Sequence, residues 1–163
     1  MATERTAWTP IAATGEVIDQ ADIRSIPGGL IAEIRLATTT LTGITSDQTP
    51  ITGWTGDVAL VSGRRYKVTT CGHVAATSTG GNFGIDTMDD GTRIQFARGH
   101  AEAGSSQFMT VMSVCFIDGD DSTHTIRADF DVIDAGTYSI ASNTGTNPCV
   151  ILVEDVGPST GFA

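Results

Sequence analysis

Basic residues are scarce in this chain. Lysine and arginine together number 9 of 163 residues, against 19 aspartates and glutamates, and the formal net charge is −10. A surface of this sign repels phosphate backbones and anionic membrane faces. The basic cluster Arg64-Arg65-Tyr66-Lys67 is expected to form ion pairs with carboxylates on neighbouring strands. We therefore expect no nucleic-acid partner.

Long hydrophobic runs are absent as well. The longest apolar stretches, such as the one from Phe108 to Ile117, are far shorter than the ~20 residues that cross a bilayer. The N-terminal sequence MATERTAWTP lacks the apolar segment of a signal peptide. We expect no membrane insertion, and synthesis in the cytosol.

Cysteine is too sparse to build a disulfide framework. Cys71, Cys115 and Cys149 are an odd number and widely spaced, each inside an apolar or strand-like run. No second cysteine stands at the spacing of a metal site. We expect reduced thiols, and a disulfide between two of the three stays open as an alternative.

Catalytic motifs are missing too. The sequence contains no Gly-x-Ser-x-Gly, no Walker A motif, no His-Glu-x-x-His and no Cys-x-x-Cys. His124 falls on the inward face of a predicted strand, where a hydrogen-bonded structural histidine is expected. The two-residue spacing of Cys71 and His73 is common by chance, so we do not interpret it as a nucleophile and base. We expect no enzyme, no catalytic residue and no cofactor.

Two acidic clusters could supply oxygen ligands to calcium. One comprises Asp86, Asp89 and Asp90, and the other Asp118, Asp120 and Asp121. Neither matches the loop of an EF-hand, since the glycine and the closing glutamate are misplaced. We expect solvated turns without a resident metal. An oligomer axis that gathers copies of one cluster would change this expectation.

Apolar and polar residues alternate along most of the chain, which predicts strands. Short strands at regular spacing, with turn residues between them, indicate an antiparallel β-sandwich or jelly roll. The turns Ser62-Gly63 and Asp89-Asp90-Gly91 each predict a tight hairpin. About nine strands are expected, over residues 30–36, 57–61, 64–71, 83–87, 92–97, 107–117, 123–132, 137–141 and 148–156.

The stretch 107–117 is apolar on both faces, so both must be covered. It is either central to a sandwich with an extra layer, or its outer face is a subunit interface. One face carries Phe108, Met112, Val114 and Phe116. We assign the other face to the subunit interface, and it consists of Met109, Val111, Cys115 and Ile117.

Residues 1–28 show neither strand nor full helical periodicity and are interpreted as an extended arm. They precede the sandwich domain, residues 29–158, and a tail, residues 159–163. An arm that orders on binding covers much surface with few residues. Its expected anchors on a partner are Trp8, Ile11, Val17, Ile18 and Ile23.

Three short motifs resemble those of virion proteins from tailed bacteriophages of actinobacteria. They are Pro27-Gly28-Gly29-Leu30-Ile31-Ala32, the hairpin sequence Gly63-Arg64-Arg65-Tyr66-Lys67-Val68, and Val153-Glu154-Asp155-Val156-Gly157-Pro158. The resemblance covers about residues 27–158. It implies a jelly roll with tumour-necrosis-factor-like topology, assembly as a homotrimer and a place in the virion. Many such proteins begin almost at the Pro-Gly motif, so the arm is a departure.

The arm favours the phage head, because a decoration protein holds a shell through extended contacts. We expect a trimeric capsid decoration protein on the capsid surface, made in the host cytoplasm, that binds the major capsid protein and stabilises the head. The alternative is a minor tail or receptor-binding protein, bound to a tail structural protein. Its loops 75–82 and 142–147 would then face a cell-surface glycan.

Overall fold

The computed structural model describes residues 28–36, 40–77, 79–104, 108–141 and 148–160, and no helix occurs among them. The predicted all-β class is therefore confirmed. Apart from Gly28, the arm and its five predicted anchors lie outside the described residues. The strands are β1 (Gly29–Arg35), β2 (Thr40–Ile44), β3 (Thr55–Leu60), β4 (Arg64–Ala76), β5 (Gly81–Asp89), β6 (Thr92–Ala101), β7 (Met109–Asp118), β8 (Ser122–Val132), β9 (Tyr138–Ala141) and β10 (Val150–Pro158).

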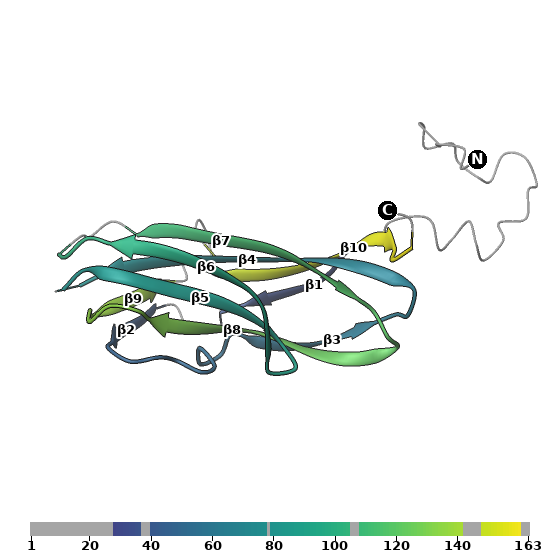
Figure 1. The fold of residues 1–163 in the computed structure, drawn as a ribbon, viewed down its shortest axis with the longest axis horizontal. Helices are drawn as coiled ribbons and strands as arrows, with labels where there is room; N and C mark the ends of the chain where they lie inside the picture. Colours follow the sequence, from purple (N-terminus) through teal and green to yellow (C-terminus); the bar gives the residue numbers. More distant parts are fainter. Residues whose placement is uncertain (1–27, 37–39, 78, 105–107, 142–147, 161–163) are drawn as a thin grey trace, which may run out of the picture.

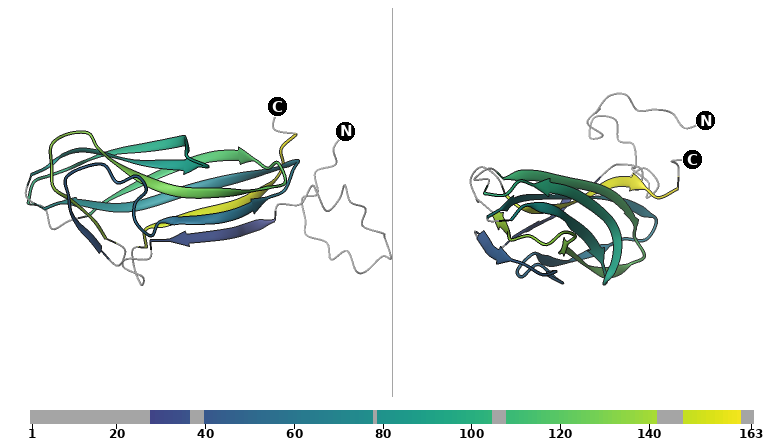
Figure 2. Two further views of the ribbon diagram at one scale, coloured as in Figure 1. Left: turned by 90° about the horizontal axis from the view of Figure 1, so that it is seen from below. Right: turned by 60° about the vertical axis from the view of Figure 1, so that its left-hand side comes forward.

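The strands form two antiparallel sheets that pack face to face, with the strands along the long axis of the molecule (Figures 1 and 2). In the first sheet β1, β10, β4 and β7 are neighbours in that order, and in the second β3, β8, β5 and β6. This order is that of a jelly roll. The short strands β2 and β9 extend the first sheet beyond the C-terminal part of β4. The predicted β-sandwich is thus confirmed.

Two local predictions were wrong. The strands joined at Ser62-Gly63 are not a hairpin, because β3 pairs with β8 in one sheet and β4 with β10 and β7 in the other. The turn at Gly63, with φ of 76°, instead carries the chain between the sheets. Strand β2 was not predicted, since its sequence TLTGI lies in a threonine-rich connection.

The hairpin at Asp89-Asp90-Gly91 is confirmed. β5 and β6 pair along their length, and Asp90 and Gly91 adopt φ of 47° and 81°. Two successive positive φ values characterise the type I′ turn, which suits the twist of a hairpin. This turn positions the Asp90 side chain at the end of the hairpin.

The core lies between the sheets and follows the predicted alternation. On β8, Ile126, Ala128 and Phe130 point inward and are fully or almost fully buried. Phe130 packs with Phe83 and Tyr138, at ring-centroid distances of 5.5–5.7 Å. A fully buried side chain such as Phe130 contributes about 1.5–3 kcal/mol by burial.

No helix among the described residues has the length and apolar character to span a membrane.

Candidate functional site

Three large apolar side chains stand side by side on the outer face of the first sheet. Met112, Val114 and Phe116, here called the apolar strip, alternate along β7 and are 63%, 40% and 58% exposed. Within the described part of the chain β7 pairs only with β4, so the strip lies along a sheet edge. Exposed apolar side chains gathered in this way make the strip a candidate binding surface.

The sequence-based assignment of β7's two faces was wrong. Val111, Cys115 and Ile117, which we expected at a subunit interface, are buried and belong to the core between the sheets. The cause is the register with β4, in which Cys115 pairs with the fully buried Val68 and therefore shares its inward direction. Met109, the fourth predicted interface residue, is 39% exposed.

On the β4 side of the strip, the charged residues Arg65 and Lys67 are already in ion pairs. The strip's β4 neighbours on the same side are Lys67, Thr69 and Cys71, which pair with Phe116, Val114 and Met112. Lys67 forms an ion pair with Glu154 of β10. One row further, Arg65 donates two hydrogen bonds to Asp118, at 2.7 and 2.9 Å. The predicted ion pairing of this basic cluster is thus confirmed.

An open pocket of about 500 Å³ lies between β6 and β7, the edge strands of the two sheets. Met112 and Val114 line one side and Phe96 and Arg98 the other. Phe96 is 50% exposed, and the Arg98 guanidinium carbon lies 5.4 Å from its ring centroid. The pocket is therefore lined by an aromatic ring and a cation beside the apolar strip.

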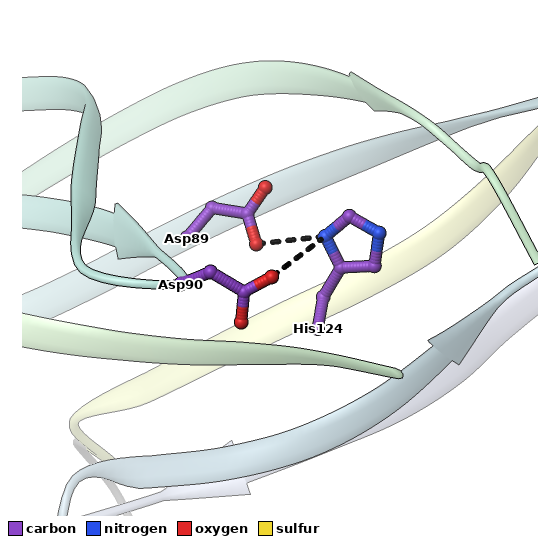
Figure 3. A group of neighbouring side chains, drawn as sticks. All are labelled: Asp89, Asp90 and His124. Carbon is purple, nitrogen blue, oxygen red and sulfur yellow. Dashed lines mark hydrogen bonds and ion pairs between the residues drawn. The ribbon is translucent and has the colours of Figure 1, made fainter. Parts of the chain in front are cut away.

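A polar site surrounds His124, where Asp89 and Asp90 of one acidic cluster approach the ring (Figure 3) and Asp120 of the other cluster contacts it as well. The ring atom Nδ1 lies 2.8 Å from Asp89 Oδ1 and 3.8 Å from Asp90 Oδ2. The other ring nitrogen, Nε2, lies 3.1 Å from Asp120 Oδ1. Burial lowers the pKa of the imidazole, but hydrogen bonds and negative charge from Asp89 and Asp120 outweigh it, so the pKa is raised. The expected inward position and hydrogen bonding of His124 are confirmed.

This convergence was not predicted, because the two clusters are some thirty residues apart in sequence. Two of the remaining acidic residues are in ion pairs, Asp86 with Arg93 and Asp118 with Arg65. Asp121 accepts a hydrogen bond from the Ser62 backbone. The acidic turns are therefore partnered rather than merely solvated.

The thiols show no sign of an activated nucleophile. All three cysteines are free, so the open alternative of a disulfide is not realised. Burial raises the pKa of Cys71, and raises that of Cys115 and Cys149 to about 11. His73 has its pKa lowered by burial, and its Nδ1 lies 3.0 Å from the Thr110 hydroxyl. A thiolate at neutral pH needs the opposite environment.

The three motifs of the phage resemblance meet at Asp155. Its Oδ2 accepts two hydrogen bonds from Arg64, at 3.0 and 2.7 Å, and its Oδ1 accepts one from the Gly157 backbone. A side chain at Gly28 would collide with the same carboxylate, at 2.7 Å from Oδ2. Gly28, Arg64 and Asp155 of these motifs therefore have a structural role in the fold.

Comparison with known proteins yields distant structural similarities. No protein-family model matches the chain, and no curated protein matches it. It is similar to the insecticidal delta-endotoxin Cry8Ea1 from Bacillus thuringiensis, with a TM-score of 0.45 and 11% identity over 72% of this chain and 20% of that one. It is similar to the C-terminal domain of EclA, a sugar-binding protein, with a TM-score of 0.39 and 13% identity over 82% and 84%.

A third similarity is to a cycloisomaltooligosaccharide glucanotransferase from Paenibacillus sp., with a TM-score of 0.40 and 11% identity. It covers 74% of this chain and 18% of that one. The chain thus spans about a fifth of the length of the toxin and of the glucanotransferase. Likenesses at these identities and TM-scores do not identify a family.

Proposed function

We propose that this chain is a non-enzymatic structural protein of a tailed-phage particle, a capsid decoration protein that assembles as a trimer. The observation that carries the proposal is the apolar strip of Met112, Val114 and Phe116, which stays exposed on a molecule of net charge −10. Adjacent exposed apolar side chains are unfavourable in water, and covering them with another subunit removes this cost. The strip is therefore the subunit interface, in place of the inward face of β7.

The occupant that best fits this face is a second copy of the same chain. The charges that flank the strip are closed within the chain, Arg65 with Asp118 and Lys67 with Glu154. Burying these two pairs adds no unpaired charge to the interface from the β4 side of the strip, and an unpaired charge there would oppose association. The resemblance to trimeric phage proteins supports three copies.

The capsid is the proposed partner of the trimer. The resemblance of the three motifs supports a place in the virion, and the arm with Trp8 as first anchor remains the predicted contact with the shell. A protein that binds only the assembled lattice stabilises that lattice by mass action. Stabilisation of the head then requires no chemistry from the chain.

Binding to empty, expanded capsids of the phage that encodes the chain tests this function. The intact protein is compared with a variant that lacks residues 1–26. We expect saturable binding by the intact chain and its loss on truncation. Absence of binding by the intact protein would reject the decoration function.

The pocket between β6 and β7 favours a second candidate, a tail protein that recognises a host-surface glycan. Sugar rings stack on aromatic side chains, and Arg98 beside Phe96 can bind acidic or hydroxyl groups. Adsorption of the protein to host cells tests this candidate. Loss on Phe96→Ala, with adsorption kept by Phe116→Ala outside the pocket, would support it, and equal loss or no adsorption would reject it.

A further inference from the structure

The side chains of Asp89, Asp90 and His124 converge from two parts of the chain. Asp89 ends β5, Asp90 follows in the turn to β6, and His124 lies on β8 (Figure 3). One ligand-type atom from each residue, two carboxylate oxygens and one ring nitrogen, lies within 4.8 Å of the others. Tetrahedral coordination at about 2.1 Å places ligand atoms about 3.4 Å apart. Small side-chain movements therefore suffice to enclose a cation.

Asp120 determines which ring nitrogen of His124 faces this group. Asp120 Oδ1 lies 3.1 Å from Nε2 and also accepts hydrogen bonds from the backbone and hydroxyl of Ser122. A carboxylate accepts only, so Nε2 carries a hydrogen and donates it. In the neutral ring, Nδ1 then presents a lone pair to Asp89 and Asp90.

A lone pair that faces two carboxylates needs a positive charge between them. His124 is 7% exposed, so water screens this repulsion poorly. Without a metal, a proton on Nδ1 supplies this charge and is donated to Asp89. A metal cation would displace that proton to solvent and take its place. A histidine whose far nitrogen donates to a carboxylate is the arrangement in which imidazole binds metals. The Asp120–His124 contact has this form.

A backbone hydrogen bond positions the Asp90 carboxylate beside the His124 ring. Its Oδ1 accepts a hydrogen bond from the Thr125 backbone at 2.8 Å, which leaves Oδ2 directed at Nδ1. The left-handed backbone of Asp90, with φ of 47°, fixes the direction of the side chain. The two oxygens thus have separate functions, one structural and one available to a ligand.

The donor set selects the class of cation. One imidazole nitrogen with two carboxylates suits zinc and similar divalent transition metals, whereas calcium and magnesium prefer oxygen ligands alone. The two charges of the cation balance those of Asp89 and Asp90. Asp90 is 55% exposed at its side chain, so water can complete the coordination.

We propose that Asp89, Asp90 and His124 bind a divalent transition-metal cation, and that Asp120 orients the His124 ring for it. The cation links the turn between β5 and β6 to the start of β8 and so fastens one end of the second sheet. This inference does not depend on the proposed place in a virion.

Titration of the full-length, chelator-treated protein with Zn²⁺ by calorimetry tests the proposal, with Ca²⁺ titrated in parallel. We expect one zinc ion per chain, no heat of binding for calcium, and a higher Tm in zinc. His124→Gln should abolish binding, while His100→Gln, at an exposed histidine outside the group, should leave it unchanged. Asp120→Asn should weaken binding by about 10–100-fold, as expected for a group that acts through the ligand.

Circular dichroism of the metal-free variants verifies that each is folded before titration. Absence of zinc binding by the folded wild type would overturn the proposal. Zinc binding that His124→Gln leaves unchanged would overturn it as well, because the ion would then lie elsewhere. Calcium binding as tight as that of zinc would contradict the nitrogen ligand.

Discussion

At the scale of single residues, a carboxylate on β10 links parts of the chain that are distant in sequence. Asp155 binds Arg64 at the start of β4 and packs against Gly28 before β1. Both side chains of the Asp155–Arg64 pair are about one-tenth exposed. Removing one charge of a buried ion pair is costly, because water screens the remaining charge poorly.

We expect Asp155→Asn to lower the free energy of unfolding by about 3–5 kcal/mol. Urea denaturation followed by circular dichroism measures this. The neighbouring Glu154→Gln is the matched control, because its pair with Lys67 is one-third exposed at each side chain. That variant should lose about 0–1 kcal/mol. Equal losses in the two variants would contradict the structural role given to Asp155.

The environment of His124 shows how far single residues were predictable. Alternation along β8 correctly placed its side chain inward and led us to expect hydrogen bonding. Its partner Asp89 is 35 residues away and is brought near because β5 pairs with β8. Such a contact depends on strand order, which a single sequence does not reveal. Patterns within one strand predicted the residue, but not the site.

At the scale of elements, β7 shows a limit of alternation. Its sequence is apolar at both odd-numbered and even-numbered positions. The pattern therefore indicated a strand that is covered on both faces, but not which face is inward. Pairing with β4 decides which face is inward. Cys115 pairs with Val68 and Ile117 pairs with Tyr66, and both β4 residues are buried. Local pattern likewise did not reveal that the tight connection at Gly63 joins strands of different sheets.

Cys71 lies on the outer face of the first sheet, so the reactivity of its thiol can show whether that face is covered. Cys71 pairs with Met112 of the apolar strip and is partly exposed, whereas Cys115 and Cys149 are buried. With pKa values of about 11, about one in a thousand of the buried thiols is ionised at pH 8. If three copies assemble through this face, Cys71 is covered as well.

We therefore expect slow reaction of all three thiols with a maleimide at pH 8 in the assembled wild type. In Phe116→Ser, which removes an apolar contact of the interface, Cys71 alone should react quickly. Mass spectrometry of the labelled peptides identifies the site, and labelling in denaturant provides the reference for full reactivity. Equal labelling of Cys71 in both proteins at one concentration would contradict an interface on this face.

At the scale of the whole molecule, the class of fold followed from the sequence with little ambiguity. Scarce charge, many turn residues and short alternating strands all favour two packed antiparallel sheets. The strand pattern left a sandwich or a jelly roll open, and the resemblance of three motifs implied the jelly roll. The structure brings these motifs together at Asp155. Assembly could not follow from the pattern, because it depends on which faces the strand order leaves exposed.

The central claim, that the apolar strip is where copies of the chain associate, is tested most directly by light scattering on the purified full-length protein at micromolar concentration. We expect a mass three times that of the 17.0 kDa chain. Phe116→Ser should shift this to the monomer, while Val61→Ser, an apolar residue of similar exposure in the turn after β3, should remain trimeric. A monomeric wild type, or a trimer that Phe116→Ser leaves intact, would contradict the account.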